Sequence, residues 1–410
     1  MASLRKKWLI LGVGRDGGAA IRVWKRERLA DSDCVGGEFV LVLAPDVQPL
    51  WEASADALVR EMSEARRPAT VLLPWLAPPT NENRFDGPVS SFACRRATFQ
   101  TLVRTADAHV SSLCYALLDG IMNQRIAVDR LAVRQLPYVP SPLTSSASPR
   151  ASLIMAHRGR RQYLRTALRY ISQANGLDVR ARIGLDEDDP SAFASIADAF
   201  PSAQFFRVMP AGAGPYVVRQ ELARRSREPL LVFHDSDDIS CYDRFLAQEA
   251  ELRRTGCDLV GCHELRVDEM EKEVTAIRFP LDVTASLNDH GGHRLWHPTT
   301  MIEREAFWAC GGFSTNRRIA NDTQFLLRAH FGMKIRNLDG FVYIRRKHPA
   351  ALTVAPGTAL DHPIRRQLAK KWLRDFEKVK RGELRLEDSS LWPVAGTARY
   401  QLRRMTRIST

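Results

Sequence analysis

The sequence predicts an α/β fold: a mostly parallel sheet flanked by helices, with a smaller α/β unit at the N-terminus. Short apolar runs bounded by turn residues read as buried strands, and segments with helical spacing lie between them. Acidic residues follow two of these strands. Parallel α/β sheets bind ligands at the carboxyl ends of their strands, so the pattern indicates a binding site there.

The elements of the main sheet follow one another between residues 151 and 233. Strands are expected at 151–156, 179–185, 204–208 and 230–233. A helix is expected at 217–227. Another is indicated after the first strand by apolar residues at helical spacing, namely Tyr163, Leu164, Ala167, Leu168 and Ile171. This alternation of strand and helix is typical of a parallel sheet.

The strand at 230–233 leads into three carboxylates within four positions, Asp235, Asp237 and Asp238. Acids packed this closely repel one another unless a cation lies between them. Hard oxygen ligands suit Mg²⁺ or Mn²⁺, which often share their coordination with substrate phosphates. The segment therefore predicts a metal and diphosphate site, although an acidic turn that caps the next helix is an alternative.

Residues 151–353 resemble a family 2 glycosyltransferase with the GT-A fold. The resemblance rests on motifs in the order that the family has them. These are the acidic end of the second strand, Asp186-Glu-Asp-Asp189, then Asp235-Ser-Asp237, Trp296-His-Pro-Thr-Thr-Met-Ile302, Gly311-Gly-Phe313, Asn321-Asp-Thr-Gln-Phe-Leu-Leu-Arg328, and Tyr343-Ile-Arg-Arg-Lys-His-Pro349 with Leu352-Thr353.

The resemblance implies a role for each matching residue. Asp186 would contact the nucleotide base, and Asp235 would lie near the ribose and the metal. Asp237 would ligate the metal with help from His348. Asp322 would be the catalytic base that takes the proton of the acceptor hydroxyl. In addition, Arg219 lies in the helix that the family places under the nucleotide, where its charge would help to bind the donor.

Two positions depart from the family pattern. Asn321 stands where the family has an acid before its base, which would alter the pKa of Asp322 or its acceptor contacts. The first strand ends in His157-Arg158 rather than in an Asn-Arg pair. Because the nucleotide can be held there by backbone groups, this change need not disable the site.

The N-terminal 136 residues are predicted to form the smaller α/β unit, which a Pro/Ser-rich linker at 137–150 joins to the catalytic domain at 151–360. Strands are expected at 8–12, 38–43 and 71–73. The segment around Asp46 parallels the strand before Asp235, which favours a degenerate, GT-A-like repeat without metal. Alternatively, Gly12-Val-Gly14-Arg-Asp-Gly17 has the spacing of a dinucleotide fingerprint, a weak signal by itself.

A basic helical tail is expected at 361–410, because residues 363–410 hold 13 Lys and Arg against 5 Asp and Glu. Its apolar positions recur at helical spacing at Ile364, Leu368, Trp372, Phe376 and Val379. This stripe would either brace the catalytic domain or dock on an anionic membrane face. Nucleic-acid binding is not expected, since no recognised motif accompanies the charge.

The remaining composition favours a cytoplasmic protein, with peripheral contact to the inner membrane face as an option. The seven scattered cysteines do not form a disulfide scaffold. No apolar run approaches the ~18 residues that span a bilayer, and the first residues lack the apolar core of a signal peptide.

The sequence therefore predicts an inverting glycosyltransferase that moves a sugar from a nucleotide-sugar donor to a glycan or lipid-linked acceptor. The competing hypothesis is a non-catalytic nucleotide-sugar-binding or assembly protein that retains the fold. A dinucleotide-dependent oxidoreductase built on the Gly12–Gly17 loop ranks third.

Overall fold

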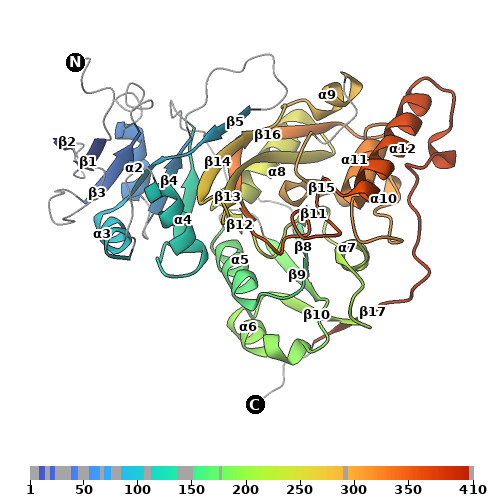
Figure 1. Ribbon diagram of the computed structural model, residues 1–410, viewed down its shortest axis with the longest axis horizontal. Helices are drawn as coiled ribbons and strands as arrows, with labels where there is room; N and C mark the ends of the chain where they lie inside the picture. Colours follow the sequence, from blue (N-terminus) through green and yellow to red (C-terminus); the bar gives the residue numbers. More distant parts are fainter. Residues whose placement is uncertain are drawn as a thin grey trace.

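The structure is a computed structural model and contains two β-sheets, one of six strands and one of eleven. It describes residues 9–13, 19–23, 38–44, 55–64, 69–74, 85–105, 112–135, 151–174, 178–289 and 294–405. The smaller sheet, from the N-terminal part of the chain, lies at the left in Figure 1, and the larger sheet forms the centre of the molecule. The predicted linker 137–150 and the residue Asp46 lie outside the described residues.

Four parallel strands form the middle of the larger sheet, in the order β11, β8, β9, β10. They are β8 (Ala151–His157), β9 (Val179–Leu185), β10 (Gln204–Met209) and β11 (Leu230–Phe233). Each lies where the sequence predicts a strand, because an apolar run buried on both faces has an unambiguous pattern. The predicted α/β class, with a sheet flanked by helices, is confirmed.

The remaining strands make this sheet mixed. They are β5 (Phe85–Pro88), β12 (Ile239–Ser240), β13 (Leu259–Asp268), β14 (Glu273–Arg278), β15 (Met301–Glu303), β16 (Ile335–Lys347) and β17 (Gln401–Arg404). Among them only β13 and β16 pair in parallel. At one edge, β17 near the C-terminus runs antiparallel to β10.

Helices cover both faces of the larger sheet. One face packs on α5 (Arg161–Gln173), α6 (Ala194–Ala199) and α8 (Arg244–Thr255). The other packs on α7 (Pro215–Arg224), α9 (Val283–Asp289), α10 (Arg304–Ala309), α11 (Asn321–Ala329) and α12 (Pro363–Lys380). Neighbouring residues of β8 divide between the two layers, with Leu153 and Met155 in one core and Ile154 in the other. Short 3₁₀ turns lie at Pro190–Phe193, His297–Thr299 and Leu386–Asp388.

The smaller sheet has the strand order β2, β1, β3, β6, β4, β7. Its strands are β1 (Leu9–Val13), β2 (Ala19–Val23), β3 (Phe39–Leu43), β4 (Ala69–Leu73), β6 (Ser91–Arg95) and β7 (Arg130–Val133). Three helices accompany it, α2 (Ala55–Glu64), α3 (Arg96–Thr105) and α4 (Leu113–Met122). Only β4 and β7 pair in parallel. This order is unlike that of the four parallel strands, so the predicted internal repeat finds no counterpart in the topology.

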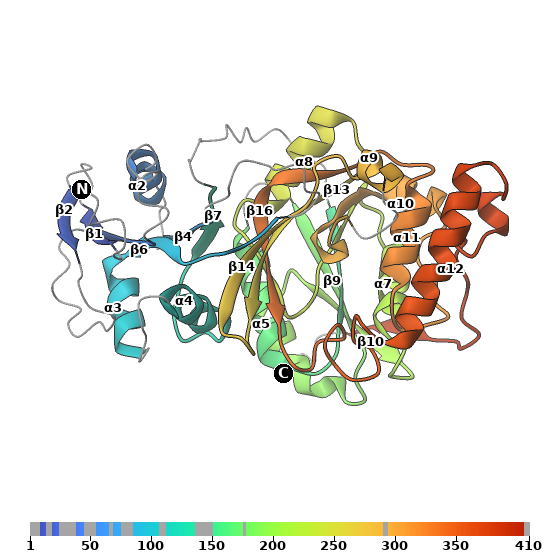
Figure 2. The same cartoon turned by 45° about the horizontal axis from the view of Figure 1, so that its top comes forward.

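The N-terminal part is joined to the larger sheet by strand pairing and by a shared core. Strand β5 pairs with β14 of the larger sheet, as Figure 2 shows at the centre of the molecule. A single apolar cluster contains residues of α3 and α4 together with residues of β13, β14 and β16. The predicted division at residues 137–150 thus separates two parts that bury apolar surface against each other.

The glycine-rich segment after β1 leads into an antiparallel neighbour. β1 and β2 pair from Leu9 with Val23 to Val13 with Ala19, and residues 14–18 between them lie outside the described residues. A dinucleotide fingerprint needs a strand, a turn and then a helix. Because β1 is followed by a strand, the oxidoreductase alternative loses its structural basis.

Glu228 holds the amino ends of the three central strands together. Just before β11, its buried carboxylate accepts hydrogen bonds from Ser152 of β8 and from Arg182 of β9, whose Nη1 lies 2.9 Å from Oε2. Arg180 pairs with it at 3.0 Å. Burial opposes the charge, but these donors outweigh it and lower the pKa of Glu228 from 4.5 to about 2. The ionised carboxylate therefore stabilises the fold.

Replacing Glu228 with Gln should lower the free energy of unfolding at pH 7 by about 3 kcal/mol, because it leaves the buried Arg182 without its counter-charge. A depressed pKa stabilises the fold above the unfolded value, and that stabilisation is lost as pH falls from 4.5 toward 2. Urea unfolding of both proteins at pH 7 and pH 3 measures this. The difference between them should shrink at pH 3, and an unchanged difference would contradict the assignment.

Helix α12 braces the part of the chain that forms the larger sheet. Trp372 and Phe376 are 2% and 0% exposed and belong to the core that contains α7, α10 and α11. The Phe376 ring lies 5.0 Å from that of Phe331, and Arg317 stacks on Trp372 at 4.9 Å. Within the apolar stripe predicted for membrane docking, Trp372 and Phe376 are therefore buried, whereas Ile364 at its amino end is exposed. None of the helices in the described part of the chain has the length and apolarity needed to cross a bilayer.

Phe376→Ala should destabilise the fold by about 3 to 5 kcal/mol, the usual cost of deleting a buried aromatic ring. Ile364→Ala on the same helix is the matched control, because Ile364 is 52% exposed and its loss should change stability by less than about 0.5 kcal/mol. Urea unfolding at pH 7 measures both changes. Equal effects of the two substitutions would show that α12 does not depend on this packing.

Candidate active site

The acidic segment lies at the carboxyl end of β11, between β8 and β15. Asp235, Asp237 and Asp238 each place a carboxylate oxygen within 4.8 Å of the others. Asp235 and Asp237 are half-buried, whereas Asp238 is 2% exposed. The sequence prediction that these acids lie together at a strand end is thus correct in geometry.

Asp238 is tied to β16 and has a structural role. Its Oδ2 accepts a hydrogen bond from the Tyr343 hydroxyl at 2.7 Å, and its Oδ1 accepts one from the Arg346 amide at 2.8 Å. Burial, followed by the charges of Asp237 and Asp235, raises the pKa of Asp238 well above its usual value. With both oxygens already bonded, Asp238 positions the loop, and Asp235 and Asp237 remain to meet a ligand.

Asp237 and His348 are in direct contact, as the sequence predicts for the metal site. His348 Nε2 lies 2.8 Å from Asp237 Oδ2, and Arg160 lies 2.9 Å from the other ring nitrogen. Arginine can only donate, so Nδ1 accepts and Nε2 carries the proton given to Asp237. Burial raises the pKa of Asp237, but the hydrogen bond and charge of His348, together with the charge of Arg346, outweigh burial and the net shift is downward.

Asp235 forms an ion pair with Arg219 of α7. Burial raises the pKa of Asp235 to about 6, against the opposing effect of Arg219 and with a further push from Asp237. Arg219 is itself 6% exposed, and the ring of Tyr216 lies 5.6 Å from its guanidinium carbon. One carboxylate of the cluster is therefore balanced by a side chain fixed in the core.

Asp322 lies in the first turn of α11 and bonds to Tyr216, one turn before Arg219 on α7. Burial and then the charge of Asp322 raise the pKa of Tyr216 well above 10, so its hydroxyl stays a proton donor. Tyr216 also packs on Phe313 of the Gly-Gly-Phe turn at 5.5 Å. Asp322 contributes electrostatically at Arg219 and Asp235, which places the predicted base in the same charge network.

Asp186 shapes a loop. Its buried carboxylate accepts three backbone hydrogen bonds, from Gly212 at 2.6 Å, Ala213 at 3.0 Å and Gly214 at 2.9 Å. The two glycines have φ values of 92° and 84°, a region that a side chain disfavours. This loop leads into α7, so Asp186 fixes the start of the helix that carries Arg219. Its predicted contact with a nucleotide base stays a prediction.

His157 is a site residue whose role the sequence did not reveal. Its Nδ1 lies 2.8 Å from the hydroxyl of Ser236, the residue between Asp235 and Asp237. Burial lowers its pKa to about 4, so the ring is neutral at pH 7. The departure at the end of the first strand was visible in the sequence, but its partner was not.

Arg346 connects the acidic loop with the N-terminal part of the chain. Its guanidinium donates to the carbonyl oxygens of Asp237 at 3.2 Å and Met122 at 3.1 Å, and to Glu269 at 2.6 Å. Met122 ends α4, so a helix of the N-terminal part contacts the residue that holds the loop. In the sequence, Arg346 is only a member of the Tyr343–Pro349 motif, with no contact assigned to it.

The segment before α11 is shaped by close packing. Gly311 and Gly312 have φ values of 76° and 67°, which favour glycine, and a Cβ at Gly312 would collide with Gln220 of α7. Asn321, the neutral neighbour of the predicted base, is fully buried and donates to the carbonyls of Ser314 and Arg317 at 2.9 Å. Its amide has a structural role that a carboxylate could not fill.

The donor set fits a divalent cation. Asp235 and Asp237 supply hard oxygen ligands. Burial, with the charge of Asp237 in addition, raises the pKa of Asp235 and of Asp238, and a cation bound beside them would favour their ionised forms. His348 reaches Asp237 with its protonated nitrogen, and its other nitrogen faces Arg160. In this arrangement His348 orients a ligand, and its predicted direct contact with a metal stays a prediction.

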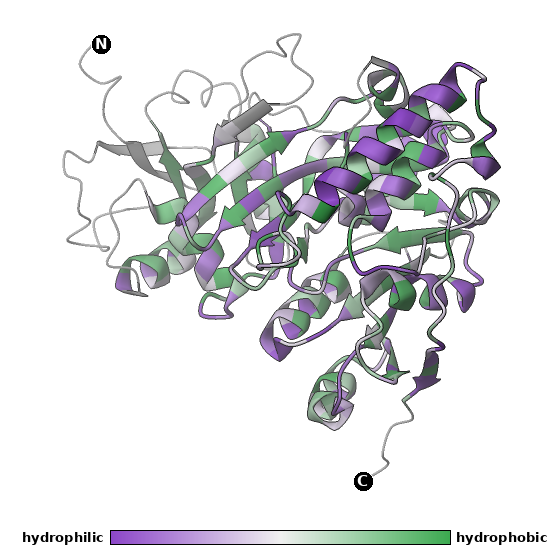
Figure 3. Ribbon diagram, turned by 45° about the vertical axis from the view of Figure 1, so that its right-hand side comes forward, coloured by the Kyte–Doolittle hydropathy of each residue, from purple (hydrophilic) through white to green (hydrophobic). Residues whose placement is uncertain are grey.

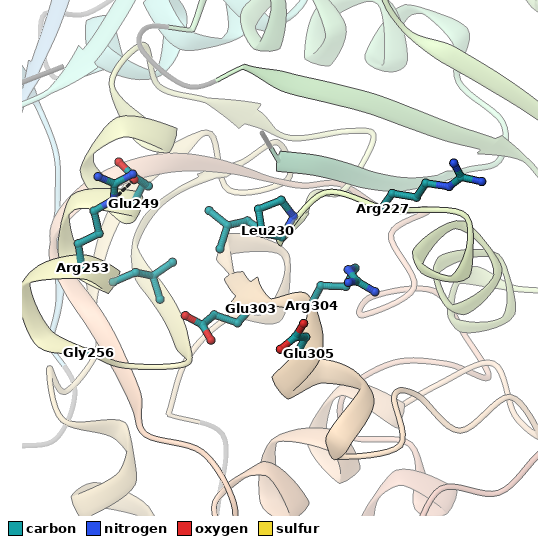
Figure 4. A pocket seen from close by; sticks show the side chains of 10 residues that line it. Arg227, Leu230, Glu249, Arg253, Gly256, Glu303, Arg304 and Glu305 are labelled. Atoms are coloured by element: carbon teal, nitrogen blue, oxygen red, sulfur yellow. Dashed lines mark ion pairs between the residues drawn. The ribbon is translucent and has the colours of Figure 1, made fainter. Parts of the chain in front are cut away.

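A separate cavity lies at the opposite ends of the strands. It has a volume of about 530 Å³ and is lined by residues before β11, on α8 and at the start of α10. Figure 4 shows Glu303 and Glu305 near Arg304 on one side and Glu249 paired with Arg253 on another. It contains none of the predicted site residues.

Comparison with known proteins gives structural similarity at low sequence identity and no match to a family or a curated sequence. No family model matches the chain, and no curated protein matches it. A structure of S. aureus TarS 1–349 with UDP aligns at a TM-score of 0.41 and 14% identity, over 56% of this chain and 71% of that one. The same fragment with UDP-GlcNAc gives 0.42 and 12%, over 56% and 73%. Mannosyltransferase PcManGT from Pyrobaculum calidifontis, with GDP-Man and Mn²⁺, gives 0.41 and 13%, over 70% and 73%. At these values the likeness does not identify an activity.

Proposed function

We propose that the chain is a glycosyltransferase of the GT-A type, which moves a sugar from a nucleotide-sugar donor to an acceptor hydroxyl with Mg²⁺ or Mn²⁺. The observation that carries this proposal is the convergence of two half-buried carboxylates, an arginine and a separate acid at one end of a parallel sheet. Asp235 and Asp237 come from the loop after β11, Arg219 from α7 and Asp322 from α11.

The donor side is built to bind a diphosphate. Asp235 and Asp237 would hold the ion, and a bound ion would offset the charge that develops on the leaving diphosphate. His348 keeps Asp237 oriented, and Ser236 is held by His157. Arg219 supplies a permanent positive charge that the buried surroundings make effective.

The acceptor side is built to remove a proton. Asp322 would accept the proton of the attacking hydroxyl, which leaves the acceptor oxygen free to bond to the anomeric carbon while the diphosphate departs. A single displacement of this kind inverts the anomeric configuration. The Tyr216 hydroxyl, which remains protonated, holds the carboxylate of Asp322 in place. A glycan or a lipid-linked precursor, reached from the cytoplasm, is the acceptor we propose.

A non-catalytic nucleotide-sugar-binding protein is the second candidate. Asp186 favours this candidate, because both of its carboxylate oxygens accept hydrogen bonds from backbone amides. The predicted contact of Asp186 with the nucleotide base would have to share these oxygens. Donor binding without turnover of any acceptor would select this candidate over the transferase.

Asp237→Asn should abolish Mn²⁺-dependent binding of UDP or GDP, because the substitution removes a charged ligand, although the amide oxygen can still accept the hydrogen bond from His348. Calorimetric titration of each nucleotide with and without Mn²⁺ measures the effect. Asp198→Asn, an exposed acid on α6, is the matched control and should bind as the unaltered protein does. Nucleotide binding that is the same with and without Mn²⁺, and the same in the Asp237 variant, would contradict the metal assignment.

Asp322→Asn should leave nucleotide binding nearly unchanged and lower turnover by roughly 10²-fold or more, the usual effect of losing a general base. Initial rates of donor consumption with an accepted glycan measure turnover, and the same calorimetry measures binding. If binding and turnover fall together, Asp322 has a structural role through Tyr216 instead.

A further inference from the structure

The outer face of helix α12 is basic along its length. The helix carries seven Lys and Arg and two acidic residues. Its apolar side chains Trp372 and Phe376 point into the core, and the basic side chains on the opposite face are exposed, namely Lys370, Lys371, Arg374 and Lys378. Figure 3 shows this outer face as hydrophilic. The buried stripe explains how α12 is anchored but not why its outer face is so strongly charged.

The basic face has little counter-charge within the described part of the chain. Lys370, Lys371 and Lys378 form no ion pair there, and Arg374 has only its neighbour Asp375 at 3.8 Å. Lys370, Arg374 and Lys378 follow at four-residue intervals, so they lie in one row. Like charges at this spacing repel and weaken a helix, so an anionic partner would relieve the repulsion.

Exposed aliphatic side chains lie at the amino end of the same helix. Among the described residues, five large apolar side chains are exposed, and three of these fall between residues 352 and 364. They are Leu352 at 40%, Leu360 at 59% and Ile364 at 52%. The amide of Leu360 donates to the carbonyl of Thr353 at 3.2 Å, which folds this segment back on itself. Aliphatic groups beside a basic row are the two components of an interfacial membrane contact.

This segment starts at the candidate active site. The Ala351 amide donates to the carbonyl of His348 at 3.0 Å, and Arg345 donates to the Thr353 hydroxyl at 3.2 Å. A surface that docks through Leu352, Leu360 and Ile364 would therefore hold the mouth of the site close to the docking plane.

We propose that the basic row Lys370, Arg374 and Lys378, together with the aliphatic group Leu352, Leu360 and Ile364, docks the protein on an anionic phospholipid membrane. The positive charge of the basic row requires a partner with negative charge. The aliphatic group favours a lipid surface over a nucleic acid, because a nucleic acid would leave those side chains in water. The inference concerns an interaction surface and does not depend on whether sugar is transferred.

Co-sedimentation of the full chain with vesicles of phosphatidylcholine, with and without phosphatidylglycerol, tests the proposal. Binding should require the anionic lipid and should weaken when salt is raised roughly tenfold, since screening shortens the reach of the charges. The triple variant Lys370→Glu, Arg374→Glu, Lys378→Glu should bind at least about 100-fold less, because each basic residue near an anionic surface contributes roughly fivefold. Leu360→Ser with Ile364→Ser should weaken the binding that remains at high salt.

A second triple variant is the control, because it removes the same charge from exposed positions on α3 and α5: Arg96→Glu, Arg104→Glu and Arg165→Glu. It should bind vesicles as the unaltered protein does, and both triple variants should bind nucleotide normally. The proposal is overturned if the unaltered protein ignores anionic vesicles, if the control loses as much binding as the first triple variant, or if a DNA duplex binds more tightly than the vesicles. Nucleotide binding that is unaffected by Asp237→Asn would contradict the proposed metal site but would not contradict the membrane proposal.

Discussion

Three carboxylates lie close together at the end of one buried strand, and the surrounding structure must offset the repulsion between them. Each carboxylate has a partner from a different part of the chain. Asp238 is hydrogen-bonded to β16, Asp237 is hydrogen-bonded to His348, and Asp235 forms an ion pair with Arg219 of α7. Mutual repulsion in a poorly solvated place would otherwise force these acids to bind protons. Burial, with the charge of Asp237 in addition, raises the pKa of Asp235 to about 6 although Arg219 opposes the shift, so a bound cation would favour the ionised form of Asp235. The elements that bond to these acids are also the ones that the donor and the acceptor of the proposed sugar transfer would contact.

The residue that holds the acidic loop, Arg346, also links the N-terminal part of the chain to the site. Arg346 donates to the carbonyl of Asp237 and also to that of Met122 at the end of α4. Its guanidinium lies 3.8 Å from the centre of the Tyr163 ring, which in turn lies 5.4 Å from His348. A buried arginine with donors in several directions holds these pieces at fixed separations. The N-terminal part thus supports the acidic loop although it contributes no predicted site residue.

The sequence allowed the four parallel strands and the position of the acids to be predicted, because both depend on local patterns. Apolar runs specify buried strands, and Asp235 and Asp237 follow one of them directly. What a residue contacts is decided by packing between distant segments. Nothing in the spacing of Tyr216 and Asp322, or of His157 and Ser236, indicates that these pairs meet. The apolar period of α12 likewise placed Trp372 and Phe376 on one face, but it did not indicate that α11 would cover them or that Ile364 would stay exposed.

The pairing of β5 with β14 has a consequence for how the chain folds. Strand β5 is made early in synthesis, yet its partner is about 190 residues farther along the chain, so their contact has a high sequence separation. The apolar cluster around α3 and α4 also remains incomplete until β13 and β16 are present. The N-terminal part must therefore wait, with its apolar surface open, while the larger sheet is synthesised. Protection by a chaperone, or a transient packing of α3 and α4 on their own sheet, would cover that surface in the interval.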